Sequence, residues 1–255
     1  MEEATSRDVP LRLICAIEPR NRLNSEQSAL DLAAAETAAR NVVEVVESLE
    51  HPVKVEVAII HDRADLALIA ASRSAIMVCV GALGRDYAAG LRLGSVAATL
   101  SRSAHCPVAI VRHHEPGLAK TGNVVADIRG TGDSDWILEC AVAEAHLRRV
   151  PLTVLATWHP RYIDVHDSRA VEDNNRLTRA QTQKRLARWR RVFPDVDIEV
   201  VPLCGSPLNY LAKHSHDVQL LVVGQDRENG LDEVVRVAVH NTEWSVLVCQ
   251  PRQPL

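Results

Sequence analysis

Residues Lys54 to Gly81 read KVEVAIIHDRADLALIAASRSAIMVCVG, and this stretch decides the fold because the chain contains it twice. Residues Asp197 to Gly224, DIEVVPLCGSPLNYLAKHSHDVQLLVVG, align with it without a gap. Each copy opens with an alternating strand, crosses a short turn into a helix and closes on a continuous apolar strand that ends in glycine. Self-similarity over such a length indicates a tandem duplication.

Shorter matches extend the duplication on both sides of this stretch. VPLRL matches VPLTV, and CPVAIV and WSVLVC close the two repeats (residues 9–13, 150–154, 106–111 and 244–249). Between the repeats, HHEPGLAKTG at 113–122 has the proline, glycine and polar character of a linker. We therefore expect one domain at 1–113, a linker at 114–122 and a second domain at 123–255.

Short apolar strands alternate with helices through both repeats. In the first repeat we expect strands at Leu11–Ile17, Val55–Ile60, Ile76–Val80 and Val108–Val111. In the second repeat we expect them at Val124–Ile128, Leu152–Ala156, Ile198–Pro202, Leu220–Val223 and Val246–Cys249. This alternation indicates βαβ crossovers and parallel sheets covered on both faces. Ala170–Val192 is expected to form a long amphipathic helix, with Leu177, Leu186, Trp189 and Phe193 near one face.

The first repeat has no counterpart of the strand at Val124–Ile128. By the repeat alignment, Glu2 to Asp8 match the tail of a helix whose start is absent. Three explanations are open: the natural start lies upstream, another chain supplies the strand, or its two neighbours pair directly. We expect the first, because Met1 falls in mid-helix and a purposeful deletion would end at a loop.

Composition excludes several classes of protein. The chain of 255 residues has 29 basic and 33 acidic residues, and its net charge of −4 argues against non-specific nucleic-acid binding. No apolar run approaches the roughly 20 residues that cross a bilayer, so no membrane partner is expected. Six scattered cysteines without C-x-x-C spacing favour the cytoplasm. His214 and His216 lack a convergent acidic or thiol ligand, so no metal site is expected.

One glycine-rich segment has the pattern of an anion site. VGALGRDYAAGLRLGS spaces Gly81 and Gly84 by two residues, and nine more separate Gly84 from Gly94 and Ser95, where a helix begins. Glycines let a backbone approach a ligand and adopt positive φ, and free amides at a helix start favour an anion. On spacing alone, a loop whose glycines only serve its turns is an equal alternative.

This pattern, followed by CPVAIVR, resembles the nucleotide-binding motif of the universal stress protein family. VPLRLICAIEP and GSPLNYL resemble further segments of that family, and the resemblance covers nearly the whole chain as two units in tandem. It implies two flavodoxin-like, Rossmann-like open parallel sheets of strand order 3-2-1-4-5, the first lacking its central first strand. It also implies that the chain binds ATP, alone or with Mg²⁺.

The resemblance implies a role for each residue that matches the motif. The residues that would wrap the phosphates and ribose are Gly81, Gly84, Gly94 and Ser95. Val96 would offer its backbone N–H to a phosphate, and the backbone of Ala16 would meet the adenine. The Asp with which the family holds the base has no counterpart in the first repeat.

The second repeat departs from the motif after Gly224. Asp127 resembles the family's base-holding Asp, but QDRENGLDEVVRVAVH contains no second glycine at the required spacing and no G-S. The loop is also about five residues shorter by the repeat alignment. We therefore expect the second repeat to pack against its partner rather than to bind nucleotide.

Together these patterns predict a stress-response protein that senses or sequesters ATP through its first domain. We find no general base, metal cluster or nucleophile array, so we expect no enzyme, and no residue argues for slow ATP hydrolysis. The alternative is a regulatory or interaction scaffold with a degenerate site. Pro107 opens an edge strand, where proline is tolerated. We therefore expect the repeats to pair as an intrachain pseudo-dimer, and the chain to form a homodimer.

Overall fold

The computed structural model describes residues 2–19, 25–48, 53–83, 93–112, 122–129, 134–159, 167–225 and 244–251. The chain forms two compact units, Met1–Ala75 and Ile76–Leu255, and each is described by itself. This division cuts through the first repeat and does not follow the linker at 114–122. The domain boundaries at 1–113 and 123–255 remain a prediction about the repeats.

The first unit is a small two-stranded sheet with three helices. Its elements are α1 (Glu2–Ser6), β1 (Leu11–Ala16), α2 (Ser25–Ser48), β2 (Val55–Ile60) and α3 (Ala64–Ser72). β1 and β2 are parallel, in a register that runs from Leu11 opposite Val55 to Ala16 opposite Ile60. The buried apolar residues described in this unit are Ala4, Ala39, Val46 and Ala67.

The second unit contains the remaining helices and strands. In chain order, its first six elements in the described residues are β3 (Val78–Gly81), α4 (Ser95–Ser103), β4 (Val108–Val111), β5 (Asn123–Arg129), α5 (Ser134–Arg148) and β6 (Leu152–Trp158). They continue with α6 (Ser168–Val192), β7 (Ile198–Cys204), α7 (Leu208–Lys213), the short 3-10 helix η1 (Ser215–Asp217), β8 (Val218–Gly224) and β9 (Ser245–Cys249). The expected helix between β8 and β9 falls at 226–243, outside the described residues.

All seven strands of the second unit form one sheet in the order β3-β4-β9-β8-β5-β6-β7. The five strands of the second repeat, β5 to β9, therefore have the predicted order 3-2-1-4-5, and the parallel α/β fold is confirmed. The first repeat supplies strands 2 and 3 as the pair β1–β2, and strands 4 and 5 as β3–β4. Each of these pairs belongs to a different unit, so each is described by itself.

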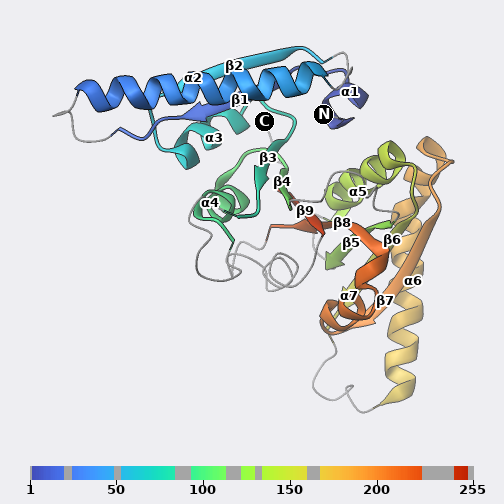
Figure 1. Ribbon diagram of the computed structural model, residues 1–255. Coiled ribbons are helices and arrows are strands. Elements are labelled where there is room, and N and C mark those ends of the chain that lie inside the picture. The colour runs from blue at the N-terminus through green and yellow to red at the C-terminus, as the bar shows by residue number, and fades with distance from the viewer. Residues whose placement is uncertain are drawn as a thin grey trace. The chain divides into compact units, whose positions relative to one another are not determined.

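The two repeats join through the last strand of each. β9 lies between β4 and β8 and pairs with β4 in antiparallel fashion (Figure 1), with Val108 opposite Val248 and Ile110 opposite Val246. The strand after Pro107 thus pairs with the other repeat, as its edge position predicted. Val108, Ile110, Val246 and Val248 are all at most 2% exposed. This strand pairing buries the join between the repeats as a continuous apolar core.

The main core lies between one face of the sheet and helices α5 and α6. It includes Leu138 of α5, Leu186 of α6 and Val154 of β6, all completely buried. Successive side chains of a strand point to opposite faces. Thr153 therefore lies on the other face of the sheet, which these two helices do not cover.

The expectation that Leu177 shares the packed face of α6 with Leu186 is wrong. Leu186 is 0% exposed, whereas Leu177 is 54% exposed. The reason is the helix period: nine residues span two and a half turns, so the two side chains point in opposite directions.

This difference gives a matched pair of substitutions on one helix. Leu186→Ala should lower the free energy of unfolding of the second unit by about 2–5 kcal/mol, because it leaves a cavity in the core. Leu177→Ala should change it by less than about 0.5 kcal/mol. Urea unfolding followed by tryptophan fluorescence measures this unit, because all four tryptophans lie within Ile76–Leu255. Equal losses for the two variants would contradict the packing described for α6.

Candidate functional site

The two ends of the glycine-rich segment meet where β3 ends and α4 begins. The Gly94 N–H donates a hydrogen bond of 2.9 Å to the Ala82 carbonyl, and the Ala82 N–H donates one of 2.8 Å to the Val111 carbonyl. The start of α4 is thereby tied to the end of β3. Residues 84–92, with Gly84, lie outside the described residues.

The start of α4 presents backbone donors without acceptors. Gly94 has φ −58° and ψ 145° and makes no side-chain cap, and the first turn contains no acidic residue. The first intrahelical bond runs from the Ala98 N–H to the Gly94 carbonyl. Within the described residues, the amides of Ser95, Val96 and Ala97 have no acceptor. Such amides, together with the helix dipole, form a site for an anion.

The described glycines of this segment do not adopt the positive φ that the sequence pattern led us to expect. Neither Gly81 nor Gly94 has a positive φ; among the described glycines only Gly205 does. A Cβ placed on Gly81 would meet just one atom within 4 Å, the Leu83 carbonyl oxygen at 3.7 Å. Among the described residues, Gly81 therefore leaves open space beside the backbone, and that space, rather than a strained conformation, is what it contributes.

The equivalent position in the second repeat is filled. Gly224 aligns with Gly81, but a Cβ there would lie 2.7 Å from the Ile137 Cδ1 of α5. Gly224 is thus a packing glycine, pressed against helix α5. The segment that would complete a second anion site, 226–243, lies outside the described residues.

The second repeat also caps the far end of α4. The Gln250 amide nitrogen donates a hydrogen bond of 3.0 Å to the Ser101 carbonyl, and that of Gln225 donates one of 2.6 Å to the Arg102 carbonyl. Carbonyls in the last turn of a helix have no intrahelical partner, so these bonds hold α4 in place. Neither glutamine was predicted from the sequence; one glutamine directly after β8 and one after β9 was the only signal.

Two other residues of the sequence prediction belong to other strands, β1 and β5. Ala16 ends β1 in the first unit, so its meeting with adenine remains a prediction. Asp127 is 3% exposed in β5, where it accepts a hydrogen bond of 3.2 Å from the Thr157 hydroxyl and one of 3.3 Å from Arg129. The Asp127 carboxylate is therefore engaged inside the second repeat.

Two buried cysteines of the second unit, Cys106 and Cys249, have raised pKa values. Burial raises the pKa of Cys106, which follows α4, to about 11. In Cys249 a hydrogen bond with Cys140, followed by burial, raises the thiol pKa well above its ordinary value. Both thiols therefore stay protonated near neutral pH, and a protonated thiol is a poor nucleophile.

Neither a metal cluster nor a membrane-spanning helix occurs in the described part of the chain. No group of three or more His, Cys, Asp or Glu side chains there could hold a metal ion. No helix among those residues is long and apolar enough to span a membrane.

Comparison with known proteins identifies relatives over most of the chain. The family model described as Universal stress protein family matches residues 1–112. The chain is 37% identical to Universal stress protein Rv2028c of Mycobacterium tuberculosis H37Rv over 238 residues, which is 92% of this chain and 82% of the relative. It is 36% identical to Universal stress protein Rv3134c of the same organism, over 87% of this chain and 80% of the relative.

A solved structure shares the fold at lower sequence similarity. A universal stress protein from Archaeoglobus fulgidus DSM 4304 superposes with a TM-score of 0.63, covering 98% of this chain and 90% of that chain at 16% identity. Identity at this level supports the two-repeat α/β fold alone.

The cap on α4 can be tested by removing the buried amide. Gln250 is 4% exposed, and Gln250→Leu would leave the Ser101 carbonyl without its partner. We expect the free energy of unfolding of the second unit to fall by about 1–3 kcal/mol. The control Gln183→Leu, on the exposed side of α6, should change it little. No difference between these variants, by the same fluorescence measurement, would show that the bond does not hold the helix.

The protonated state of Cys106 predicts its pattern of chemical labelling. Maleimide at about pH 8 should modify the exposed thiols of Cys79 and Cys204 and leave Cys106 and Cys249 unmodified until the chain is unfolded. Because the pKa of Cys106 is higher in the fold, its contribution to stability is present below about pH 9 and is lost as the pH rises toward 11. Peptide mapping by mass spectrometry measures the labelling, and rapid modification of Cys106 in the native protein would contradict its burial.

Proposed function

This chain belongs to the universal stress protein family, and we propose that it acts in the stress response by binding ATP at the start of α4, thereby sensing or sequestering this nucleotide. The observation that carries the proposal is the set of three amides, Ser95 to Ala97, that have no acceptor among the described residues. An ATP triphosphate supplies the negative charge that such a helix end attracts.

Each residue of the motif would contribute differently to binding the phosphates. The amides of Ser95 and Val96 would donate to phosphate oxygens, and the exposed Ser95 side chain could add its hydroxyl. The open space beside Gly81 would let the ligand approach the backbone. Gly94 keeps the helix start beside β3 through its bond to Ala82. Ala16 and Gly84 remain part of the proposed site through the family motif.

The second repeat would serve as the support of this site. Gln225 and Gln250 hold the carboxyl end of α4, and the β4–β9 pairing fixes the strand that follows this helix. A site that binds phosphate through backbone amides depends on the position of its helix. We therefore assign positioning, rather than a second nucleotide, to this half of the chain.

Three further parts of the proposed function have their basis in the sequence. We propose a non-enzymatic protein of the cytoplasm, with any Mg²⁺ arriving on the phosphates, and a homodimer. Within the described residues, β3 and β7 are the strands that end the seven-stranded sheet, and they are the edges at which a second copy could pair.

An interaction scaffold that binds no nucleotide is the second candidate. It is favoured by one specific observation: Asp127, which resembles the family's base-holding Asp, lies in the second repeat, where its carboxylate is bonded to Thr157 and Arg129. The adenine would then lack its side-chain partner, and the phosphate contacts alone would have to supply the affinity.

A charge placed at the start of α4 separates these two functions. Ser95→Asp stabilises a helix N-terminus but repels a phosphate, so ATP affinity should fall at least about tenfold while the fold is kept. The neutral variant Ser95→Asn, which is close in size to Ser95→Asp, should bind ATP within about threefold of the unchanged chain. Isothermal titration calorimetry measures both.

Either of two results would overturn the nucleotide proposal. Equal affinities for Ser95→Asp and the unchanged chain would place ATP elsewhere. Absence of ATP binding by the unchanged, folded chain would favour the interaction scaffold.

A further inference from the structure

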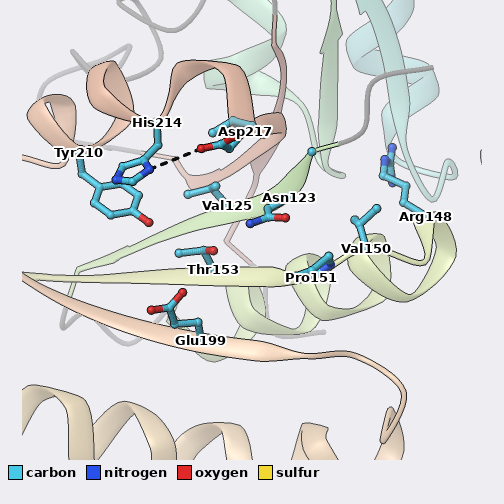
Figure 2. A pocket seen from close by; sticks show the side chains of 12 residues that line it. Asn123, Val125, Arg148, Val150, Pro151, Thr153, Glu199, Tyr210, His214 and Asp217 are labelled. Atoms are coloured by element: carbon cyan, nitrogen blue, oxygen red, sulfur yellow. Dashed lines mark ion pairs between the residues drawn. The ribbon is translucent and has the colours of Figure 1, made fainter. Parts of the chain in front are cut away.

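A cavity of about 690 Å³ opens in the second unit, on the face of the sheet that α5 and α6 leave uncovered (Figure 2). It lies at the amino ends of β5, β6 and β7, and α7 and η1 form one of its walls. Its polar lining residues include Asn123, Thr153, Glu199, Tyr210, His214 and Asp217. The volume is in the range of small-molecule sites.

This cavity is separate from the proposed nucleotide site. The strands β4, β9 and β8 stand between β3, which leads to α4, and β5, which borders the cavity. Four steps between neighbouring strands span about 19 Å. A ligand in the cavity would therefore not touch the start of α4, and the two sites can be occupied independently.

A hydroxyl without a protein partner among the described residues lies on the floor of the cavity. The register places Val125, Thr153 and Glu199 side by side on three neighbouring strands. Thr153 is 4% exposed, and among the described residues its hydroxyl makes no hydrogen bond. Figure 2 shows it directed into the cavity. A hydroxyl can both donate and accept hydrogen bonds, so this one is available to a ligand in the cavity.

Further groups at the cavity lack partners within the same described ranges. Neither the Glu199 carboxylate nor the Asn123 carboxamide forms a hydrogen bond or ion pair there, and the Tyr210 hydroxyl has no hydrogen-bond partner. Figure 2 shows the Tyr210 hydroxyl directed toward the side of the cavity that holds Thr153 and Glu199. One concave surface thus gathers a carboxylate, an amide and two hydroxyls whose hydrogen-bonding capacity is unused.

The charge of the lining is negative. Arg148 is the one arginine or lysine among the described residues that line the cavity, and it is bonded to the buried carboxylate of Glu144. The Asp217 carboxylate oxygen Oδ2 lies 3.6 Å from Nδ1 of His214, and this ring is charged only when it is protonated. The pKa of Tyr210 is raised by burial and then by the carboxylates of Glu199 and Asp217, which agrees with a negative potential in the cavity. A cationic ligand fits this potential best.

The walls suit an organic cation better than a metal ion. In the described part of the chain no three His, Cys, Asp or Glu side chains gather as metal ligands. Instead, the rings of Tyr210 and His214 stack with centroids 4.3 Å apart, and Val125, Val150 and Pro151 supply apolar surface. Aromatic faces attract ammonium groups, and apolar surface suits methylene chains.

We propose that this cavity binds an aliphatic amine of the polyamine class. One ammonium group would pair with Glu199 and donate hydrogen bonds to the Thr153 and Tyr210 hydroxyl oxygens, while a second would face Asp217. The methylene chain between them would lie over the apolar residues. Gly122 lines the closed side of the cavity. A larger residue would clash there, because a Cβ at this position would lie 2.9 Å from the Asp217 carbonyl oxygen.

Calorimetric titration of the full chain with spermidine, and separately with putrescine, tests this site. The titration is done without nucleotide, because amines associate with ATP in solution. Binding to the unchanged chain is expected at low ionic strength. Glu199→Gln should weaken it at least about tenfold, and Thr153→Val several-fold, because each removes a partner of the ammonium group. The control Glu172→Gln, an exposed carboxylate on α6 that does not line the cavity, should leave the affinity within about threefold.

Each possible outcome of this titration either supports the amine site or overturns it. A selective loss in Glu199→Gln, with an unchanged melting temperature in the absence of ligand, supports the site. An equal loss in Glu172→Gln would show that amines are attracted only by the general negative charge, and would overturn it. No binding of either amine at millimolar concentration would also overturn the proposal. A failure of ATP to bind would leave this result untouched.

Discussion

The antiparallel pairing of β4 with β9 is the constraint on which the rest of the second unit depends. It joins the last strands of two repeats into one seven-stranded sheet and buries Val108, Ile110, Val246 and Val248 along the join. Once β9 lies beside β4, Gln250 and Gln225 reach the last carbonyls of α4 and hold that helix at its carboxyl end. The opposite end of α4, where the amides have no acceptor among the described residues, is thereby fixed in position, so a pairing between strands determines where an anion can bind.

Two glycines at equivalent positions, Gly81 and Gly224, show that the repeats have diverged around this join. Gly81 borders open space, whereas Gly224 at the equivalent position is pressed against Ile137. The first repeat thus has open space beside this glycine among the described residues, and the second has a packing contact there. At the amino ends of its strands, however, the second repeat keeps polar groups, such as the Thr153 hydroxyl, that have no partner among the described residues. Duplication has thus given two copies of one fold with different surfaces available for ligands.

Much of this fold could be predicted from the sequence, because the duplicated stretch defines strands by their apolar runs and the glycines that end them. The pairing of the strand after Pro107 was predicted on a different ground, the tolerance of edge strands for proline. The α4 start was predicted from the G-S pair, but the caps Gln225 and Gln250 were not, since a glutamine after a strand resembles any exposed glutamine. Leu177 was misplaced because its spacing from Leu186 is two and a half turns. The cavity was missed because its lining comes from several separate elements and the segments beside them.

The proposed nucleotide site consists of backbone amides that receive a polyphosphate, and NMR observes those amides directly. In a ¹⁵N–¹H correlation spectrum of the labelled chain, addition of ATP should shift the signals of Ser95, Val96 and Ala97 by more than those of Gly224 and Gln225, because the former point at the ligand and the latter are packed or bonded within the sheet. Shifts of the three amides that saturate with the calorimetric affinity are the result we predict. Unmoved signals at these three residues, while ATP shifts others or none, would contradict an ATP site at the start of α4.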